Sequence, residues 1–168
     1  MLLRLAQPED ALQIARVHVR SWQVAYLGLL PEEYLRNLRA EDRAAGYDLS
    51  AATPDKPRTI VAINEREVIG FATTMPSRDP DLPQHSELCA LYVDPGWWNR
   101  GVGGALISAA REHLVASGFR SALLWVLVGN QRAERFYLAD GWTADGHRRT
   151  EHVWNVAADE VRYQRPLP

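Results

Sequence analysis

The chain has 168 residues, of which 46% are hydrophobic and 24% are charged, and its formal net charge is −2 at pH 7. This length and composition predict one compact globular domain, residues 1–168, and the charge balance argues against nucleic acid or an anionic membrane as a partner, because both usually require concentrated Lys and Arg. No segment carries the long apolar core of a signal peptide or a membrane span, so we expect a cytoplasmic protein.

The N-terminal part of the chain predicts a short strand followed by helices. Leu2–Ala6 is strand-like, and Pro8 can occupy the first turn of a helix that ends at Gly28. After Pro31, shorter helical segments are expected through residues 34–38 and 41–47. The apolar stripe of the first helix consists of Leu12, Ala15, Val19, Trp22 and Tyr26.

The middle of the chain is rich in β-branched residues. Thr59–Ile63 and Val68–Thr74 flank a polar turn, which predicts an antiparallel hairpin. Pro76–Pro83 is then expected to be a polar loop, and Glu87–Val93 a further strand.

Helices and strands alternate in the C-terminal part. Val102–Ala116 and Gln131–Ala139 are predicted helices, and Ser121–Val128 between them is a predicted buried strand. Two final strands are expected over Trp142–His147 and Glu160–Arg165. These elements predict an α/β (α+β) domain whose mixed, mostly antiparallel central sheet is flanked by helices.

A glycine-rich loop joins the strand that ends at Val93 to the helix that begins at Val102. Helix N-termini leave backbone N–H groups unpaired and carry partial positive charge, so this loop is suited to bind a phosphate. The dinucleotide fingerprint fails because Leu106 occupies the place of its last glycine, and the Gly-Lys pair of a P-loop is missing. The glycines also fit a purely structural reading, in which they allow a tight turn and close packing.

Two linked motifs resemble those of the GNAT superfamily of N-acetyltransferases. Residues 91–95 followed by residues 100–106 match the strand, loop and helix with which that family binds acetyl-coenzyme A (acetyl-CoA). Residues 124–130, with Ala133, Phe136-Tyr137 and Gly141-Trp142, resemble the next strand and helix, and residues 21–31 resemble a pattern of small members. The resemblance covers nearly the whole chain. It implies a GNAT-like domain that transfers acetyl from acetyl-CoA to a primary amine by direct attack in a ternary complex.

By this resemblance, the cofactor-binding residues are Leu91, Tyr92, Val93, Trp98, Asn99, Arg100, Gly101, Val102, Gly103, Gly104, Asn130, Ala133, Phe136 and Tyr137. The backbone of Leu91 and Val93 is expected to bind the pantetheine arm as an added strand. Trp98 stands where the family usually has Gln or Arg. Binding should survive, since backbone amides make most pyrophosphate contacts, with Asn99 or Arg100 compensating. Asn130 fits a helix cap equally well.

Acetyl transfer needs an amine that has lost its proton, and Glu87 is the expected proton acceptor, directly or through water. Strand alternation would place Glu87 on one face with Cys89 and Leu91. Alternatively, Glu87 lies exposed at the start of the strand and forms an ordinary surface ion pair. Tyr137 matches the family position that supplies a proton to the leaving thiolate, and its alternative is a core tyrosine.

Other aromatic residues leave two readings open. Trp22 and Tyr26, with Glu87, are the expected acceptor-binding residues, although a helical aromatic stripe is more often core. Trp97 and Trp98 fit either a cover over the cofactor or a contact in a homodimer. The acceptor itself is not specified: it could be a protein N-terminus, a lysine, an amino acid, a polyamine or an aminoglycoside.

Cysteine and histidine usage argues against other chemistries. Cys89 is the only cysteine, which excludes an internal disulfide and favours strand packing over a role as an acetylated nucleophile. The five histidines show no metal-binding spacing, so we expect no metal. The alternative functions are a CoA-binding regulatory or scaffolding module without turnover and, less favoured, a generic nucleotide-binding protein.

Overall fold

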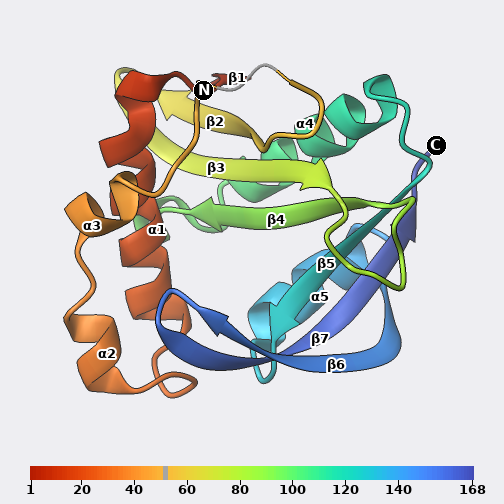
Figure 1. Ribbon diagram of the computed structural model, residues 1–168. Coiled ribbons are helices and arrows are strands. Elements are labelled where there is room, and N and C mark those ends of the chain that lie inside the picture. Colours follow the sequence, from red (N-terminus) through yellow and green to blue (C-terminus); the bar gives the residue numbers. More distant parts are fainter. Residues whose placement is uncertain (51–52) are drawn as a thin grey trace.

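A mixed sheet forms the centre of the computed structural model, which describes residues 1–50 and 53–168 (Figure 1). Over these residues the strands are β1 (Leu2–Leu5), β2 (Arg58–Asn64), β3 (Glu67–Pro76), β4 (Ser86–Val93), β5 (Ser121–Leu127), β6 (Thr143–Val153) and β7 (Val156–Pro166). The α-helices are α1 (Ala11–Ala25), α2 (Glu32–Arg36), α3 (Ala40–Ala44), α4 (Val102–Ala116) and α5 (Gln131–Ala139). Short 3-10 helices, η1 (Pro8–Asp10) and η2 (Pro95–Trp97), precede α1 and α4.

The strands lie in the order β1-β2-β3-β4-β5-β7-β6, and β4 with β5 is the parallel pair of this mostly antiparallel sheet. That pairing is short: Ser86 lies opposite Ala122 and Glu87 opposite Leu123. Beyond these residues the two strands separate, and Figure 1 shows them meeting at the right and spreading apart toward the left. The sheet therefore contains a wedge at its middle.

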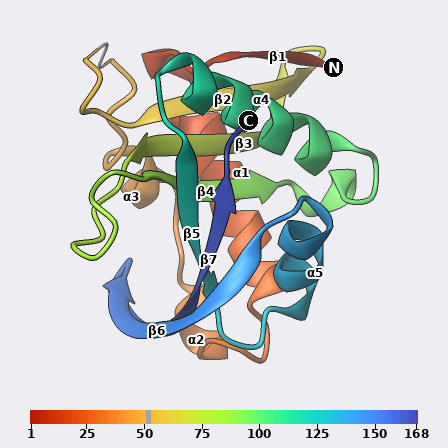
Figure 2. The ribbon, with the colours of Figure 1, turned by 90° about the vertical axis from the view of Figure 1, so that its right-hand side faces the viewer.

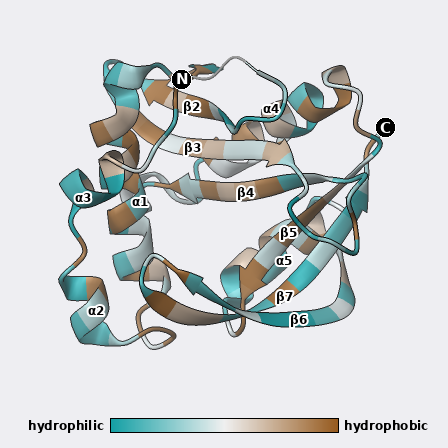
Figure 3. Cartoon of the chain, viewed as in Figure 1, coloured by the Kyte–Doolittle hydropathy of each residue, from teal (hydrophilic) through white to brown (hydrophobic). Residues whose placement is uncertain are grey.

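Helices cover both faces of the sheet. Figure 2 shows α4 and α5 on the right-hand side of the sheet and α3 on its left. One core cluster packs Leu106 and Ile107 of α4 against the central strands, and another packs Ile14 and Val17 of α1 against Phe71 of β3. In Figure 3 brown, apolar stretches run along β2 to β5, the centre of the sheet. No helix in the described part of the chain combines the length and apolarity needed to cross a bilayer.

The predicted order of elements and the fold class are confirmed, and helices α4 and α5 have the predicted bounds. The last two strands are longer than predicted, because Trp154 and Asn155 form a turn between two strands of 11 residues each. The predicted stripe of α1 is wrong at Leu12, which is exposed. Leu12 lies two positions before Ile14, about 200° around the helix and away from the sheet.

A bulge in β4 overturns the predicted strand alternation. Thr73 lies opposite Ala90 while Thr74 lies opposite Leu88, so Cys89 is an extra residue. The bulge reverses which side chains share a face beyond it. Glu87 shares its face of the sheet with Ala90 and Tyr92, and Leu91 shares the other face with Leu88 and Val93.

Candidate active site

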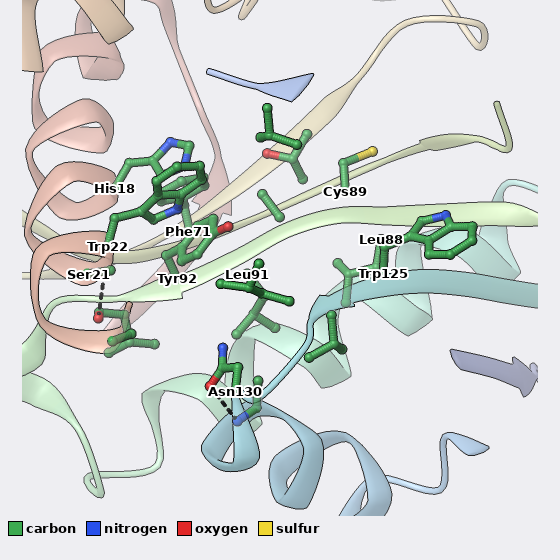
Figure 4. A pocket seen from close by; sticks show the side chains of 18 of the residues that line it. His18, Ser21, Trp22, Phe71, Leu88, Cys89, Leu91, Tyr92, Trp125 and Asn130 are labelled. Carbon is green, nitrogen blue, oxygen red and sulfur yellow. Dashed lines mark hydrogen bonds between the residues drawn. The ribbon is translucent and has the colours of Figure 1, made fainter. Parts of the chain in front are cut away.

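The separation of β4 from β5 opens a cavity of about 1200 Å³ that both strands line. Its walls also come from α1, α3, α5, the loop before α4 and the β6–β7 turn. Figure 4 shows His18, Trp22 and Tyr92 gathered at one end of this cavity and Asn130 at the other. The loop predicted to bind the cofactor and the aromatic residues of α1 thus share a single cavity.

The loop before α4 carries backbone amides beside this cavity. Gly101 has a φ of +80°, in the left-handed region that favours glycine, where the chain turns into α4. The first backbone hydrogen bond of α4 runs from the Ala105 amide to the Gly101 carbonyl at 3.0 Å, so the amides of residues 102–104 precede the helical ladder. A Cβ at Gly103 would lie 3.3 Å from the Phe136 ring, so a larger residue there would need a small shift of that ring. This helix start has the features of an anion site.

Trp98 is fixed between the end of β4 and α5. Its indole N–H donates to the Val93 carbonyl at 2.7 Å, and the same carbonyl accepts the Ser21 hydroxyl at 2.9 Å. The guanidinium carbon of Arg132 lies 3.4 Å from the centroid of the Trp98 ring. The cation beside the loop therefore comes from α5, where sequence reasoning did not look for it.

Two of the predicted cofactor-binding residues do not line the cavity. Arg100 lies over the ring of Trp97, 5.2 Å from its centroid, and the Val102 side chain is buried in the core under α4. Asn99 lines the cavity with a φ of +60°. Arg100 therefore does not replace the polar side chain that Trp98 displaces.

The edge of β4 that faces β5 keeps unused hydrogen-bonding groups. The Asp94 amide donates to the Ile69 carbonyl of β3 at 2.9 Å, and antiparallel alternation then directs the backbone groups of Leu91 and Val93 away from β3. β5 does not pair with these residues. The Val93 carbonyl already accepts two hydrogen bonds, which leaves its amide and both groups of Leu91 as the open edge.

The start of α5 closes the same end of the cavity. The Asn130 side chain accepts a hydrogen bond from the Ala133 amide at 3.2 Å, so it caps the helix, as Figure 4 shows. Asn130, Ala133 and Phe136 all line the cavity. The structural reading of Asn130 is confirmed, and its side chain also borders the space beside the loop.

Tyr137 lines this cavity, and its hydroxyl is not hydrogen-bonded to a described core residue. Its ring packs edge-on against Phe136 and Trp142 at 5.3 and 6.1 Å, and its hydroxyl makes no hydrogen bond to a residue that the structure describes. Burial, together with nearby Tyr92, raises the pKa of Tyr137 well above its usual range. The phenol therefore keeps its proton at neutral pH.

Glu87 is buried, with 3% of its surface exposed, and it lines the cavity. Arg78 donates to it through Nη2 at 2.8 Å and Nε at 3.2 Å, and the Arg78 amide donates at 3.3 Å. The exposed-carboxylate alternative is wrong, because only the arginine of this ion pair is largely exposed. These hydrogen bonds from Arg78 hold the Glu87 carboxylate in place at the cavity wall.

A second carboxylate on the cavity wall was missed by sequence reasoning. Glu160 of β7 accepts a hydrogen bond from Arg149 at 3.0 Å, and Arg149 lies over the ring of Trp125. Burial raises the pKa of Glu160, although Arg149 opposes this shift. No spacing in the sequence connects Glu160 to Glu87, because β5 lies between their strands in the sheet.

The predicted acceptor residues Trp22 and Tyr26 are both buried and both line the cavity. Their rings lie 5.0 Å apart, and the Tyr26 hydroxyl lies 3.3 Å from that of Tyr92. They therefore belong to the core and to the cavity wall at once, so the two readings of the aromatic stripe do not exclude each other.

His18 is a buried polar residue among these rings. It stacks on Tyr92 at 4.6 Å, and its Nδ1 contacts the Tyr47 hydroxyl at 2.7 Å and the Arg43 Nε at 3.3 Å. Because a guanidinium only donates, Nδ1 must accept, and the ring proton of neutral His18 is on Nε2. Burial, helped by the charge of Arg43, lowers the pKa of His18 well below its usual range. Nε2 is buried without an acceptor among the described residues.

The wall around His18 is completed by segments distant in the sequence. The Trp154 ring lies 5.1 Å from those of His18 and Trp22, and the Arg43 guanidinium lies 5.0 Å from the Trp154 ring. Trp154 has a φ of +52°, unusual for a bulky residue, and its carbonyl accepts a hydrogen bond from the Tyr34 hydroxyl. The β6–β7 turn is thereby tied to α2.

The cavity offers little support for covalent or metal chemistry. Burial, with the charge of Glu87, raises the pKa of the Cys89 thiol to about 12, which disfavours the nucleophilic thiolate. Among the residues that the structure describes, no three His, Cys, Asp or Glu side chains gather as a metal site would require.

Comparison with known proteins assigns the chain to a family. A sequence model of the acetyltransferase (GNAT) family matches residues 17–142. The chain is 33% identical, over 132 residues, to the uncharacterized N-acetyltransferase YuaI of Bacillus subtilis, and the match covers 76% of this chain and 72% of YuaI.

Solved structures agree on the fold. A GCN5-related N-acetyltransferase from Rhodopseudomonas palustris aligns over 99% of this chain and 95% of its own, with a TM-score of 0.76 and 23% identity. The protein yncA of Salmonella typhimurium, solved with its cofactor acetyl-CoA, aligns over 100% and 94%, with a TM-score of 0.73 and 17% identity. The family match spans most of the chain and includes the β4 to α4 segment described above. The chain belongs to the GNAT family of acetyltransferases.

Proposed function

We propose that this protein transfers the acetyl group of acetyl-CoA to a primary amine by direct attack in a ternary complex. The observation that carries the proposal is the wedge between β4 and β5, where an open strand edge and the amide-bearing start of α4 border one cavity. That cavity is large enough for two substrates at once, which a ternary complex requires. The acetyl-CoA complex of yncA, which shares this fold, supports the choice of donor.

The residues present fit the donor. The amides of residues 102–104 and the Arg132 guanidinium would bind the pyrophosphate, and the open groups of Leu91 and Val93 would bind the amides of the pantetheine arm. Acetyl-CoA supplies the acetyl group: the amine nitrogen forms a C–N bond with the thioester carbon, the C–S bond breaks with its electron pair on sulfur, and the amine proton goes to a base.

Two side chains have the proton chemistry that the transfer needs. Glu87 is an anion at the cavity wall on the face it shares with Tyr92, and it would accept the amine proton through a water molecule. Tyr137 keeps its phenolic proton at neutral pH and would donate it toward the leaving sulfur. Glu160 is the competing proton acceptor, so both carboxylates have to be tested.

An amine panel assayed by thiol release tests the reaction. We expect turnover with acetyl-CoA, loss of kcat in Glu87→Gln and Tyr137→Phe, and a smaller loss in Glu160→Gln. A larger loss in Glu160→Gln would transfer the role of base to Glu160. Wild-type turnover in both Glu87→Gln and Tyr137→Phe would overturn both assignments.

Thermal-shift measurements with acetyl-CoA, ATP and NAD test the donor separately, since a bound ligand raises the melting temperature. We expect stabilisation by acetyl-CoA alone. Stabilisation by acetyl-CoA without thiol release from any amine would instead indicate a CoA-binding module without turnover. Absence of stabilisation by acetyl-CoA would overturn the proposed function.

A further inference from the structure

We propose that the amine acceptor also carries an anionic group, such as a carboxylate, and that Arg43 binds this group. The inference rests on the proposed function, because it assigns the end of the cavity opposite Asn130 to the acceptor. It narrows the acceptor to amino-acid-like amines and excludes polyamines.

At the aromatic end of the cavity, one charged side chain, Arg43, has no partner of opposite charge among the described residues. The four carboxylates that line the cavity all have a cationic partner: Asp48 contacts Lys56, Glu87 contacts Arg78, and both Glu151 and Glu160 contact Arg149. Arg132 and Arg135 lie on α5, beside the loop that is suited to phosphate. Arg43 alone is a cation without a carboxylate within 4.0 Å, among the described residues, at the aromatic end.

Arg43 is half-buried, and the N–H groups of its guanidinium are only partly used. A guanidinium has five N–H groups, and Arg43 uses its Nε to donate to His18. The planar fork of the remaining groups matches a carboxylate or a similar oxyanion. A half-buried cation without a counter-ion gains more from such a partner than an exposed one does.

His18 holds the Nε of Arg43 in place, because its Nδ1 accepts a hydrogen bond from that atom. Its Nδ1 already accepts from Arg43 and Tyr47, so the N–H on Nε2 is the group left over. That group is buried and unpartnered, and leaving a buried donor unsatisfied costs stability. Because the surrounding rings enclose this group, His18 acts on Arg43 through Nδ1 and does not itself contact the acceptor.

The aromatic residues do not make this end a cation site. Rings of this kind attract a cation over their faces, but Arg43 already occupies that place, 5.2 Å from the Tyr47 ring and 5.0 Å from the Trp154 ring. A second ammonium group would meet the charge of Arg43 in a half-buried space. The cavity therefore discriminates against diamines by repulsion as well as favouring anions by attraction.

The backbone conformation of the β6–β7 turn fixes the position of Trp154 beside Arg43. A positive φ at a bulky residue is strained, and it persists where the surrounding structure enforces it. Tyr34 donates to the Trp154 carbonyl, and Figure 1 shows the β6–β7 turn lying beside α1. The Trp154 ring therefore keeps Arg43 against the cavity rather than free in solvent.

Matched ligands test the proposal. δ-Aminovalerate, its amide and cadaverine have the same chain length, and their distal groups are anionic, neutral and cationic; alanine with alaninamide extends the set. Dissociation constants are measured by calorimetry on the free and the CoA-saturated protein, and kcat/KM is measured by thiol release. Calorimetry does not require turnover.

We expect the wild type to bind each carboxylate about tenfold more tightly than its amide, which is about 1.4 kcal/mol, and to bind cadaverine least well. Arg43→Gln should bring carboxylate and amide within about twofold, and Arg43→Glu should favour cadaverine. Arg43→Lys should keep part of the preference, which guards against misreading a folding defect. Arg36→Gln is the matched control: Arg36 is exposed, lies outside the cavity, and should leave the preference unchanged.

Equal binding of carboxylate, amide and cadaverine by the wild type would overturn the inference, and so would an undiminished preference in Arg43→Gln. These outcomes leave the proposed function intact if acetyl-CoA binds and thiol is released. Conversely, a protein that binds carboxylates through Arg43 but does not bind acetyl-CoA would overturn the proposed function and leave the anion site standing.

Discussion

Arg132 and Trp98 form a stacked pair at the mouth of the loop before α4, with the guanidinium carbon 3.4 Å from the ring centroid. By the resemblance described above, Trp98 stands where the family usually has Gln or Arg, and the loop would then lack that polar side chain. The stack brings in a cation from another helix, and burial lowers the pKa of Arg132 without removing its charge. We interpret the pair as the replacement for the missing side chain.

Arg132→Gln and Trp98→Ala should each raise the dissociation constant for acetyl-CoA about tenfold, and the double variant should add little to either. Each change removes the same placed cation. Isothermal titration measures the constants, and Arg66→Gln, an exposed arginine in the β2–β3 turn, is the control. An equal effect with dephospho-CoA would assign the contact to the pyrophosphate; additive losses would contradict the shared role.

Tyr137→Phe should lower kcat by about 100-fold while leaving the dissociation constant for acetyl-CoA unchanged. The phenylalanine ring keeps the packing against Trp142 and loses only the proton. Because the pKa of Tyr137 lies well above its usual range, ionisation of this phenol should not lower wild-type kcat between about pH 7 and pH 9. Tyr163→Phe, whose hydroxyl contacts Glu134 outside the cavity, is the matched control and should keep its kcat.

His18 should make the folded state sensitive to mild acid. Its folded pKa is well below 6.5, so as the pH falls below 6.5 the unfolded chain binds the proton first and the free energy of unfolding decreases. This contribution is fully present above the unfolded pKa and decreases by up to about 1.4 kcal/mol per pH unit below it. Urea titrations should show a smaller loss in His18→Gln than in the wild type. Parallel curves for the two proteins would contradict this prediction.

Arg162→Met should lower the free energy of unfolding by about 3–5 kcal/mol, because it leaves the buried carboxylate of Asp79 and the partly buried one of Asp145 without their cation. Arg162 is 3% exposed and donates to Asp79 at 2.8 Å and Asp145 at 2.6 Å. Arg36→Met, which breaks an exposed ion pair with Glu32, should cost less than about 0.5 kcal/mol. Denaturant unfolding measures both free energies. A similar, small loss in the two variants would show that the ion pairs of Arg162 stabilise the fold no more than an exposed pair does.

The carboxylates bound to Arg162 also predict that the free energy of unfolding decreases at low pH. Burial opposes ionisation of Asp145, but hydrogen bonds from Gln164, the His147 amide and Arg162 lower its pKa to about 2. A depressed carboxyl pKa contributes stability that is present above the unfolded value of 3.8 and is lost as the pH falls toward about 2. Unfolding curves in this range should fall less steeply in Asp145→Asn than in the wild type.

Local signals explain why α4 and α5 could be predicted to the residue. Gly101 and Asn130 stand directly before the two helices, and each performs the turn or cap that its residue type favours. The bulge at Cys89 has no such signal, since its neighbours fit a regular strand equally well. The turn at Trp154 was missed because a tryptophan is a poor predictor of positive φ.

The two ends of the candidate site also differ in how far the sequence predicts them. The end for which we propose phosphate binding comes largely from one contiguous segment, so a sequence motif could identify it. The aromatic end is assembled from α1, α3 and the β6–β7 turn, which bring His18, Arg43 and Trp154 together only in the folded chain. No spacing rule links these three residues, and nothing in the sequence shows that Arg43 lacks a carboxylate partner. The contact between Trp98 and Arg132 likewise appears only in the folded chain.

The two-residue pairing of β4 with β5 also determines how the molecule moves. Among the described residues, the backbone ladder joins strands β1 to β4 with strands β5 to β7 only around Ser86 and Glu87, and side-chain pairs such as Arg162 with Asp79 add further links. Native-state hydrogen exchange resolves cooperative units within a fold, and we expect these two blocks to exchange separately. A substrate that contacts both contributes its binding free energy to holding them together. We therefore expect a ligand in the wedge to slow amide exchange at the ends of β5 and β7.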